Sequence, residues 1–362
     1  MQIKHLKLLN FKNYVGIQHE FSEGINLIVG PNGSGKTNLL DAVHVLSTSR
    51  GAFNHIDSQH IRWGEQFFTL KAELLTSEGK QYDLQCSVER GKKKLLACDG
   101  KEYEKISDHY GRFPAVLVAP YDTDLVREGS EIRRKFFDSI IAQLDRKYLS
   151  QLSQYQNILR QRNEAIRKMA ESRRIDHALI EAYNAQLLPL NQQIMERRSA
   201  FLEQFLPIFL EKHQQVSEGK ETVKISYRSE VQEDTFEADF LKNFSRDLTL
   251  MRTELGIHRD KYTFEISRRS LKKYGSQGQQ KTFVLALKLA QFEIIRQEKN
   301  KTPLLLLDDI FDKLDTRRTE RLIELIREKQ FGQVFITDAT PDRALALFQN
   351  LSAKVISTQD GP

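Results

Sequence analysis

The chain has 362 residues, 40% of them hydrophobic and 29% charged, and this composition excludes an intrinsically disordered protein. Its formal net charge of +6 permits a polyanionic partner without requiring one. Its two cysteines, Cys86 and Cys98, exclude a disulfide framework and a four-cysteine zinc site. Charge interrupts the first apolar residues, and no run approaches the roughly 18 apolar residues of a membrane span, so we expect a cytoplasmic protein with no membrane partner.

The N-terminal part reads as strands separated by turns, with one helix. Residues 24–30 form a short apolar strand that ends in a glycine-rich loop, and residues 38–46 carry apolar side chains at helical spacing. Alternating apolar and polar residues between positions 67 and 96 predict antiparallel strands, and residues 114–120 predict another buried strand. We place the first domain at residues 1–130.

Helical periodicity dominates the middle of the chain. The run from Ile141 to Leu159 predicts one amphipathic helix, and a second helical stretch covers residues 176–213. Two antiparallel helices of this kind, at about 1.5 Å per residue, would form an arm roughly 50 Å long. The turn between them is predicted within residues 171–176, where Ser172 or Asp176 is suited to cap the second helix.

Mixed strand and helix patterns return after about residue 218. Residues 304–307 and 333–337 are predicted as buried parallel strands. We place the helical arm at residues 131–250 and the last domain at residues 251–362.

Residues 30–37 match the phosphate-binding pattern G-x-x-x-x-G-K-[ST] between a predicted strand and a predicted helix. The glycines allow backbone N–H groups to surround a phosphate, and the helix N-terminus adds partial positive charge. Lys36 is expected to reach the β- and γ-phosphates of ATP, and the Thr37 hydroxyl is expected to hold Mg²⁺.

Two carboxylates follow the predicted strand 304–307. Asp308 is the expected second ligand of Mg²⁺, and Asp309 is expected to polarise the attacking water. This strand lies far along the chain from the phosphate-binding loop, with the helical arm between them, which predicts one ATP site assembled from both chain ends. A compact small-molecule kinase or a GTPase has a different layout, and no N-K-x-D guanine-reading motif occurs.

A third motif lies at residues 274–281, directly before a strongly helical stretch. It resembles the S-x-G-Q core of the ABC-type ATPase signature, and residues 311–315 resemble the D-loop of that superfamily. The whole chain resembles the RecF family of DNA-repair ATPases, with further matches at residues 10–14, 131–138 and 256–260.

The resemblance implies a fold and a function. The fold is α/β: an ABC-type P-loop ATPase head assembled from both chain ends, with an inserted short antiparallel helical arm. A RecF-type protein is expected to dimerise head to head on DNA when it binds ATP, to hydrolyse ATP slowly as a weak DNA-stimulated ATPase, and to help load recombinase together with RecO and RecR. It would serve DNA replication, recombinational and gap repair and the SOS response in the bacterial cytoplasm, at the nucleoid. Duplex, single-stranded and gapped DNA are the expected substrates.

The resemblance also assigns residues. Ser276, Gly278 and Gln279 would contact the γ-phosphate of ATP held by the other subunit, and Asp315 would lie at the dimer seam. The expected catalytic residues are Lys36, Ser276 and Asp309. The expected nucleotide-binding residues are Gly30, Pro31, Asn32, Gly33, Ser34, Gly35, Lys36, Thr37, Asn38, Ser276, Gly278 and Gln279.

The chain departs from the family pattern at three positions. Lys12 stands where relatives often have arginine. Lysine keeps the positive charge but lacks the two-pronged hydrogen bonding of a guanidinium group. Tyr121 occupies the region of the glutamine loop, and Asp338 stands where many ABC proteins have a switch histidine.

Basic residues are frequent in the helical region and are candidate contacts to DNA phosphates. The alternative is that they lie on solvated helix faces. No base-reading module is recognised, so recognition of DNA form rather than sequence is expected. These candidates are Arg133, Arg134, Arg160, Arg162, Arg167, Lys168, Arg173, Arg174, Arg197 and Arg198, with the basic turn 92–94.

Three other functions are compatible with a phosphate-binding loop. A transporter ATPase places its signature about a hundred residues after the loop, and Ser276 is too distant. A small-molecule phosphotransferase requires an acceptor pocket and a lid that the sequence does not identify. An architectural SMC-like protein requires far longer coiled arms than about 50 Å.

Overall fold

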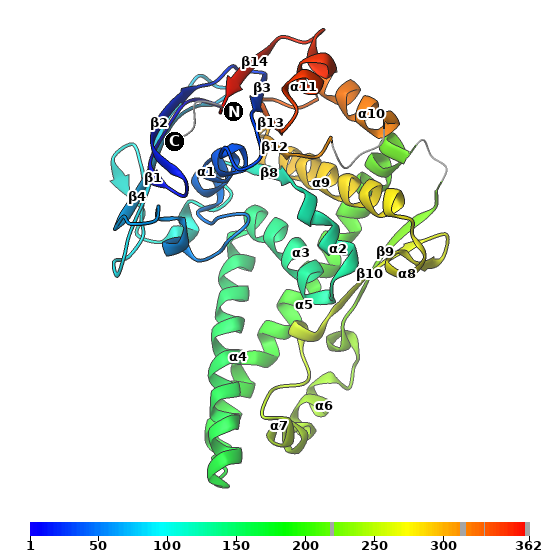
Figure 1. Ribbon diagram of the computed structural model, residues 1–362. Helices are drawn as coiled ribbons and strands as arrows, with labels where there is room; N and C mark the ends of the chain where they lie inside the picture. Colours follow the sequence, from blue (N-terminus) through cyan, green and yellow to red (C-terminus); the bar gives the residue numbers. More distant parts are fainter. Residues whose placement is uncertain (218–220, 312–315, 329, 359–362) are drawn as a thin grey trace. The chain divides into compact units, whose positions relative to one another are not determined.

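The computed structural model describes residues 1–217, 221–311, 316–328 and 330–358 (Figure 1). The chain divides into two compact units. Unit 1 comprises residues 1–123, 211–220 and 276–362, and unit 2 comprises residues 124–210 and 221–275. Both chain ends therefore contribute to unit 1, and each unit is described separately below.

A five-stranded parallel sheet forms the centre of unit 1. Its order is β14 (Ala353–Ser357), β3 (Ile25–Val29), β13 (Val334–Asp338), β12 (Leu304–Asp308) and β8 (Ala115–Val118). The three central strands are buried along their whole length, as expected for a parallel sheet covered on both faces. The strands predicted at 24–30, 114–120, 304–307 and 333–337 are confirmed.

The second sheet of unit 1 has six strands and is antiparallel. Its order is β2 (Tyr14–Glu20), β1 (Gln2–Phe11), β4 (Phe67–Leu75), β5 (Gln81–Glu89), β6 (Leu95–Cys98) and β7 (Lys101–Glu102). Alternate residues of β4 are buried, because one face of this sheet covers the core. Helix α1 (Lys36–Thr48) contacts strands of both sheets (Figure 1), and its apolar side chains are fully buried between them.

The remaining helices of unit 1 come from the C-terminal half of the chain. They are α9 (Gln277–Lys299), α10 (Thr316–Arg327) and α11 (Pro341–Phe348), together with short 3-10 turns at Asp57–His60, Ile106–Asp108 and Pro120–Thr123. Helix α9 contacts β8. The last turns of α5 (His177–Ser217), from residue 211 onward, also belong to this unit.

Unit 2 is mainly helical and carries one three-stranded sheet of order β11 (Arg269–Ser270), β10 (Lys261–Ile266) and β9 (Val223–Arg228). Its helices are α2 (Asp124–Arg127), α3 (Ser130–Leu144), α4 (Arg146–Ser172), most of α5, α6 (Phe236–Lys242), α7 (Phe244–Leu250) and α8 (Leu271–Tyr274), with 3-10 turns at Glu230–Gln232 and Ile257–Arg259.

Helices α4 and α5 run antiparallel, as predicted. Arg162 Nε donates to Asn184 Oδ1 at 3.0 Å, and Gln151, nearer the start of α4, contacts Gln193, nearer the end of α5. The turn between the helices lies at residues 173–176, and Asp176 Oδ1 accepts from the Leu179 backbone N–H at 3.0 Å. Asp176 is therefore the predicted cap.

The single helix predicted across Ile141–Leu159 is wrong. Helix α3 ends at Leu144 and α4 begins at Arg146, because Asp145 adopts an extended conformation and its side chain accepts from the Tyr148 backbone N–H. Apolar spacing continues across the break and hides it. Helix α4 has 27 residues and α5 has 41, so they are about 40 Å and about 60 Å long, on either side of the predicted length of about 50 Å. Among the described helices, none has the length and apolar composition needed to cross a membrane.

Candidate nucleotide-binding site

The phosphate-binding loop and the acidic strand, two of the predicted motifs of unit 1, meet at one edge of the parallel sheet. Strands β3, β13 and β12 are adjacent and parallel, with Asp308 paired to Thr337 and Thr337 paired to Ile28. The loop after β3 and the carboxylates that end β12 therefore lie at the carboxyl ends of neighbouring strands, where open α/β sheets bind ligands.

The loop of residues 30–37 contains glycines in left-handed backbone conformations. Gly33 and Gly35 adopt φ values of 83° and 102°, which other residues rarely adopt. A Cβ atom on Gly35 would lie 2.7 Å from both Asn13 Nδ2 and the Tyr14 hydroxyl, so the side chain is excluded by space as well as by φ. Lys36 Nζ donates to the carbonyls of Gly30 at 2.8 Å and Pro31 at 2.9 Å.

Thr37 and Asp308 lie together, although they are 271 positions apart in sequence: Thr37 Oγ1 donates to Asp308 Oδ1 at 2.9 Å. Thr337 Oγ1 donates to the same oxygen at 2.8 Å. Burial raises the pKa of Asp308, and the hydrogen bonds from Thr337 and Thr37 oppose that shift. A hydroxyl and a carboxylate oxygen are ligands that Mg²⁺ takes together with phosphate oxygens and water, so these residues fit the predicted metal.

No cluster of three or more histidine, cysteine, aspartate or glutamate side chains suited to a metal occurs in the described part of the chain. A magnesium site of one carboxylate and one hydroxyl needs no such cluster, because the nucleotide supplies further oxygens.

Asp309 directly follows β12 in an unusual backbone conformation. Its φ is 47°, a left-handed value that aspartate tolerates better than most residues. Its backbone N–H donates to Thr337 Oγ1 at 2.9 Å. Thr337 therefore contacts both aspartates, the carboxylate of Asp308 and the backbone of Asp309.

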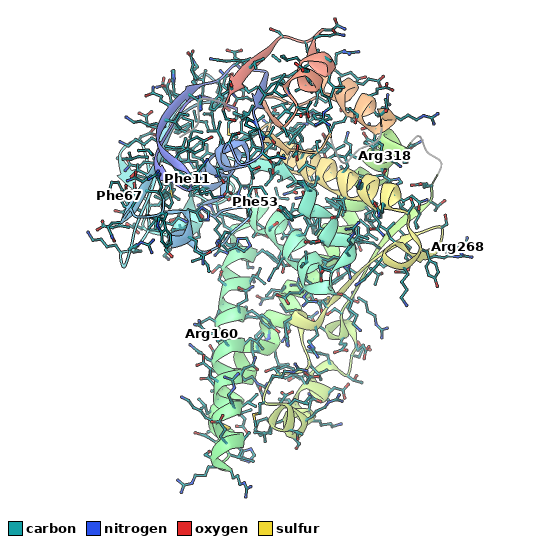
Figure 2. The ribbon with its side chains drawn as sticks, viewed as in Figure 1. Phe11, Phe53, Phe67, Arg160, Arg268 and Arg318 are labelled. Carbon is teal, nitrogen blue, oxygen red and sulfur yellow. The ribbon has the colours of Figure 1, made fainter. Side chains whose placement is uncertain are left out.

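The signature residues lie at the start of α9. Ser276 Oγ accepts from the Gln279 backbone N–H at 3.2 Å, and Gln279 Oε1 accepts from the Ser276 backbone N–H at 2.8 Å, which is a capping box. Ser276 is exposed. Arg318 (Figure 2) contacts Thr282 through Nε, and its Nη1 would lie 3.2 Å from a Cβ on Gly278. The predicted D-loop residue Asp315 lies outside the described residues.

Sequence reasoning missed Thr358. Strand β14 pairs with β3, and Thr358 N–H donates to the Val29 carbonyl at 2.9 Å. The Thr358 hydroxyl is 2.5 Å from the Ser34 hydroxyl in the loop. Only the pairing of two strands from opposite chain ends creates this contact, so no local motif signals it. Asn13 lies in the family match at residues 10–14 but is not a predicted site residue. Its Oδ1 accepts from Asn38 Nδ2 at 2.7 Å.

Ion pairs lie at two of the positions that depart from the family pattern and next to the third. Lys12 Nζ lies 2.5 Å from Asp41 Oδ2 on α1. Asp122, next to Tyr121, is paired with Lys288 on α9 at 2.6 Å. Asp338 is buried and is held by Arg343 at 2.7 Å.

Two of the candidate phosphate contacts are buried, which is neither the DNA contact nor the solvated face considered for them. Arg162 and Arg198 are 0% and 1% exposed, and each is paired inside unit 2, Arg162 with Asp247 at 2.8 Å and Arg198 with Asp138 at 2.9 Å. Helical spacing alone does not separate a buried paired arginine from a solvated one. The candidates on the exposed surface of α4 and the following turn are Arg160 (Figure 2), Arg167, Lys168, Arg173 and Arg174.

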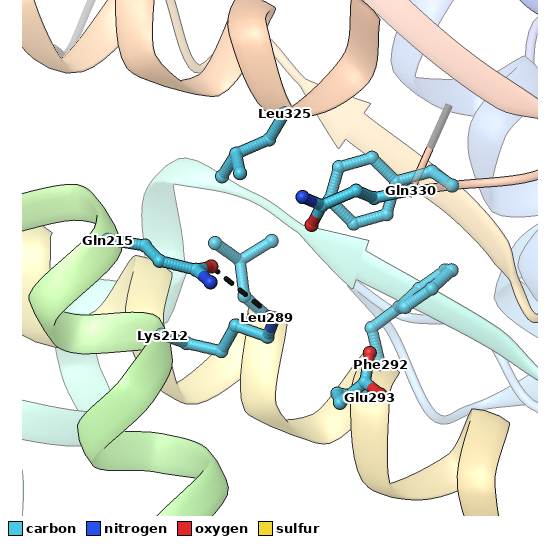
Figure 3. A pocket seen from close by; sticks show the side chains of 8 residues that line it. Lys212, Gln215, Leu289, Phe292, Glu293, Leu325 and Gln330 are labelled. Carbon is cyan, nitrogen blue, oxygen red and sulfur yellow. Dashed lines mark hydrogen bonds between the residues drawn. The ribbon is translucent and has the colours of Figure 1, made fainter. Parts of the chain in front are cut away.

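Figure 3 shows a hollow elsewhere in unit 1, lined by α9 and by the end of α5. Lys212 Nζ donates to Gln215 Oε1 at 3.3 Å on one side, and Leu289 and Phe292 line the other. This hollow contains none of the predicted nucleotide-binding residues.

Comparison with known proteins identifies relatives along nearly the whole chain. Residues 2–354 match the model of the RecF/RecN/SMC N terminal domain. The DNA replication and repair protein RecF of Flavobacterium johnsoniae is 43% identical over 354 residues, which cover 97% of each chain.

Solved structures also resemble this chain over nearly its whole length. The solved structure of the recombination mediator protein RecF-ATP in the RecFOR pathway is 28% identical, covers 93% of this chain and 92% of its own, and superposes with a TM-score of 0.86. The Smc head domain of Pyrococcus furiosus, at 20% identity, covers 98% of this chain and 92% of its own with a TM-score of 0.56, which shows a shared fold. The predicted fold class, an ABC-type α/β head with an inserted helical arm, is confirmed.

Proposed function

Because the chain belongs to the RecF family, we propose that it is an ATP-dependent DNA-binding protein of recombinational and replication-gap repair. The observation that carries this proposal is the 2.9 Å contact between Thr37 and Asp308. It joins the phosphate-binding loop, with its glycines in left-handed backbone conformations, to the acidic strand from the other end of the chain.

ATP is the proposed nucleotide, supported by the RecF-ATP structure that this chain resembles. The N–H groups of residues 30–37 and the Lys36 ammonium would bind the phosphates, and Asn38 would extend the contacts at the start of α1. Thr37 and Asp308 would hold Mg²⁺, which when bound neutralises charge on the phosphate oxygens. Asp309 would orient and polarise the water that attacks the terminal phosphate.

The second half of the site is proposed to come from another copy of the chain. Ser276 is exposed at the N-terminus of α9, where a helix favours an anion. Ser276, Gly278 and Gln279 of one subunit would meet the γ-phosphate held by its partner. ATP binding would then dimerise the heads, and slow hydrolysis would release them.

This nucleotide-controlled dimer is proposed to hold DNA and to act with RecO and RecR in loading recombinase, as a bacterial cytoplasmic protein. The named relatives support this role: one is a DNA replication and repair protein and the other a recombination mediator of the RecFOR pathway. DNA is also proposed to stimulate ATP hydrolysis.

Binding to duplex, single-stranded and gapped DNA, measured with and without ATP across a salt series, tests the switch. ATP is expected to raise DNA affinity by roughly 5- to 150-fold, the usual range for coupled binding sites. Lys36→Ala is expected to abolish the ATP effect, because the phosphates lose their cation. DNA affinity that is equal with and without ATP in the wild-type protein contradicts the switch.

A further inference from the structure

The only tryptophan of the sequence lies almost wholly in solvent. Trp63 is 93% exposed, although tryptophan is highly buried on average. Contact with a partner would bury the large apolar surface of the indole ring, and the flat face of the ring can stack on another planar group.

The backbone around Trp63 fixes this exposure. Residues 62–65 form a tight turn, in which the Glu65 N–H donates to the Arg62 carbonyl at 3.0 Å and Gly64 has a φ of 87°. Strand β1 anchors the turn, because the Arg62 N–H donates to the Asn10 carbonyl at 2.9 Å and Asn10 Nδ2 donates to Glu65 Oε2 at 3.2 Å. Trp63 therefore projects from a turn that hydrogen bonds tie to β1.

A basic turn lies beside the turn of Trp63. The Arg90 backbone N–H donates to the Gln66 carbonyl at 2.9 Å, and Arg90 Nε reaches the Glu65 carbonyl at 3.4 Å. Arg90 begins the connection between β5 and β6, which continues through the exposed residues Lys92 and Lys93. The aromatic turn and the basic turn are thus held together by hydrogen bonds within unit 1.

The residues Arg62, Trp63, Phe67, Arg90, Lys92 and Lys93, which lie on or next to these two linked turns, are together called the Trp63 patch. Phe67, at the start of β4, is 39% exposed and gives the patch a second aromatic ring (Figure 2). The basic side chains outnumber the nearby carboxylates Glu65 and Glu89, of which Glu89 is paired with Lys92 at 2.8 Å.

We propose that the Trp63 patch binds single-stranded nucleic acid, with a base stacked on Trp63 and phosphates held by Arg90 and Lys93. Aromatic rings interleaved with basic side chains match bases that alternate with phosphates, whereas an acidic peptide would engage the charges alone. The inference rests on the nucleic-acid partner proposed above, but the patch contains no residue of the phosphate-binding loop. Its binding is therefore expected without ATP.

Because Trp63 is the only tryptophan, its emission reports on the patch directly. The full-length protein is titrated with a thymidine oligonucleotide without nucleotide, and quenching of the emission is expected. By fluorescence anisotropy of a labelled oligonucleotide, Trp63→Ala is expected to weaken binding roughly 5- to 100-fold, with partial recovery in Trp63→Phe, because one stacked ring is lost and then replaced by a smaller one. The exposed side chain makes both variants compatible with folding, which circular dichroism checks.

Charge is tested separately with a matched pair. Lys93→Glu is expected to weaken binding and to reduce its salt dependence, because a phosphate contact is lost, whereas Lys101→Glu, exposed on the same sheet, is expected to change neither. Unchanged emission at saturating oligonucleotide overturns the proposal. Equal quenching and competition by polyglutamate also overturns it, since that result assigns the patch to acidic proteins.

The test also separates this site from the ATP switch. In Lys36→Ala the quenching is expected to persist. Quenching with no ATP effect on DNA affinity supports the patch and contradicts the switch. An ATP effect without quenching supports the switch and contradicts the patch.

Discussion

Replacing Arg198 by methionine is expected to lower the free energy of unfolding of the protein by about 3–5 kcal/mol, the usual cost of breaking a buried ion pair. Arg198 on α5 donates from Nε and Nη2 to both oxygens of Asp138 at 2.9 Å, and from Nη1 to Asp260 at 2.6 Å. Burial opposes the charge of Arg198, but Asp138 and Asp260 hold its pKa above the ordinary arginine value. Its removal leaves buried carboxylates without their cation.

Urea unfolding measures this loss, and the neighbouring arginine supplies the control. Arg197 pairs with Asp145 at 3.1 Å, but both side chains are about 30% exposed, so Arg197→Met is expected to cost less than about 1 kcal/mol. Burial raises the pKa of Asp260 even beside Arg198. Removing Arg198 raises the pKa of Asp260 further, because the neighbouring positive charge is lost. Asp260 of the variant then becomes neutral as the pH falls, so the loss of unfolding free energy in Arg198→Met is expected to become smaller at low pH. Equal losses in the two variants contradict this account of the cluster.

Replacing Asp309 by asparagine is expected to lower kcat for ATP hydrolysis by roughly 100- to 10,000-fold, the range for losing a general acid–base group. Asparagine keeps the shape and the backbone bond to Thr337 Oγ1, but it lacks the charge that polarises the attacking water. ATP binding and ATP-dependent dimerisation are expected to survive, because the phosphate contacts assigned to residues 30–37 are unchanged.

Single-turnover hydrolysis and equilibrium ATP binding distinguish this role from that of the adjacent carboxylate. Asp308→Asn is expected to reduce magnesium-dependent ATP affinity, because Asp308 contacts Thr37 at the predicted metal site. A normal rate in Asp309→Asn, with no loss of turnover, assigns the polarising role to another residue.

The sequence predicts those parts of the molecule in which neighbouring residues carry the signal. The phosphate-binding loop needs glycines at set spacing, and the buried strand before Asp308 is a continuous apolar run, so both are visible locally. Asp176 was one of two predicted caps, because a short polar side chain before a helix has a local function.

Long-range pairing explains what the sequence does not reveal. Thr358 reaches Ser34 only because β14 aligns with β3. Arg198 lies in a stretch that looks solvated and basic, and its partners Asp138 and Asp260 are distant in sequence. The break at Asp145 is hidden for a different reason, since the apolar spacing of α3 continues into α4.

Each ATP site is proposed to combine the phosphate-binding loop of one subunit with the signature of another. Mixing two inactive variants tests whether the site is shared in this way. Lys36→Ala removes the loop lysine. Ser276→Arg blocks the signature and also removes a helix cap, which costs about 1 kcal/mol and leaves the fold intact.

In a two-fold dimer of one subunit of each variant, one site has both an intact loop and an intact signature. Steady-state ATP hydrolysis of an equimolar mixture is therefore predicted to rise well above that of either variant alone, to about a quarter of the wild-type rate with random pairing. A mixture that hydrolyses ATP no faster than the average of the separate variants would contradict a site shared between subunits.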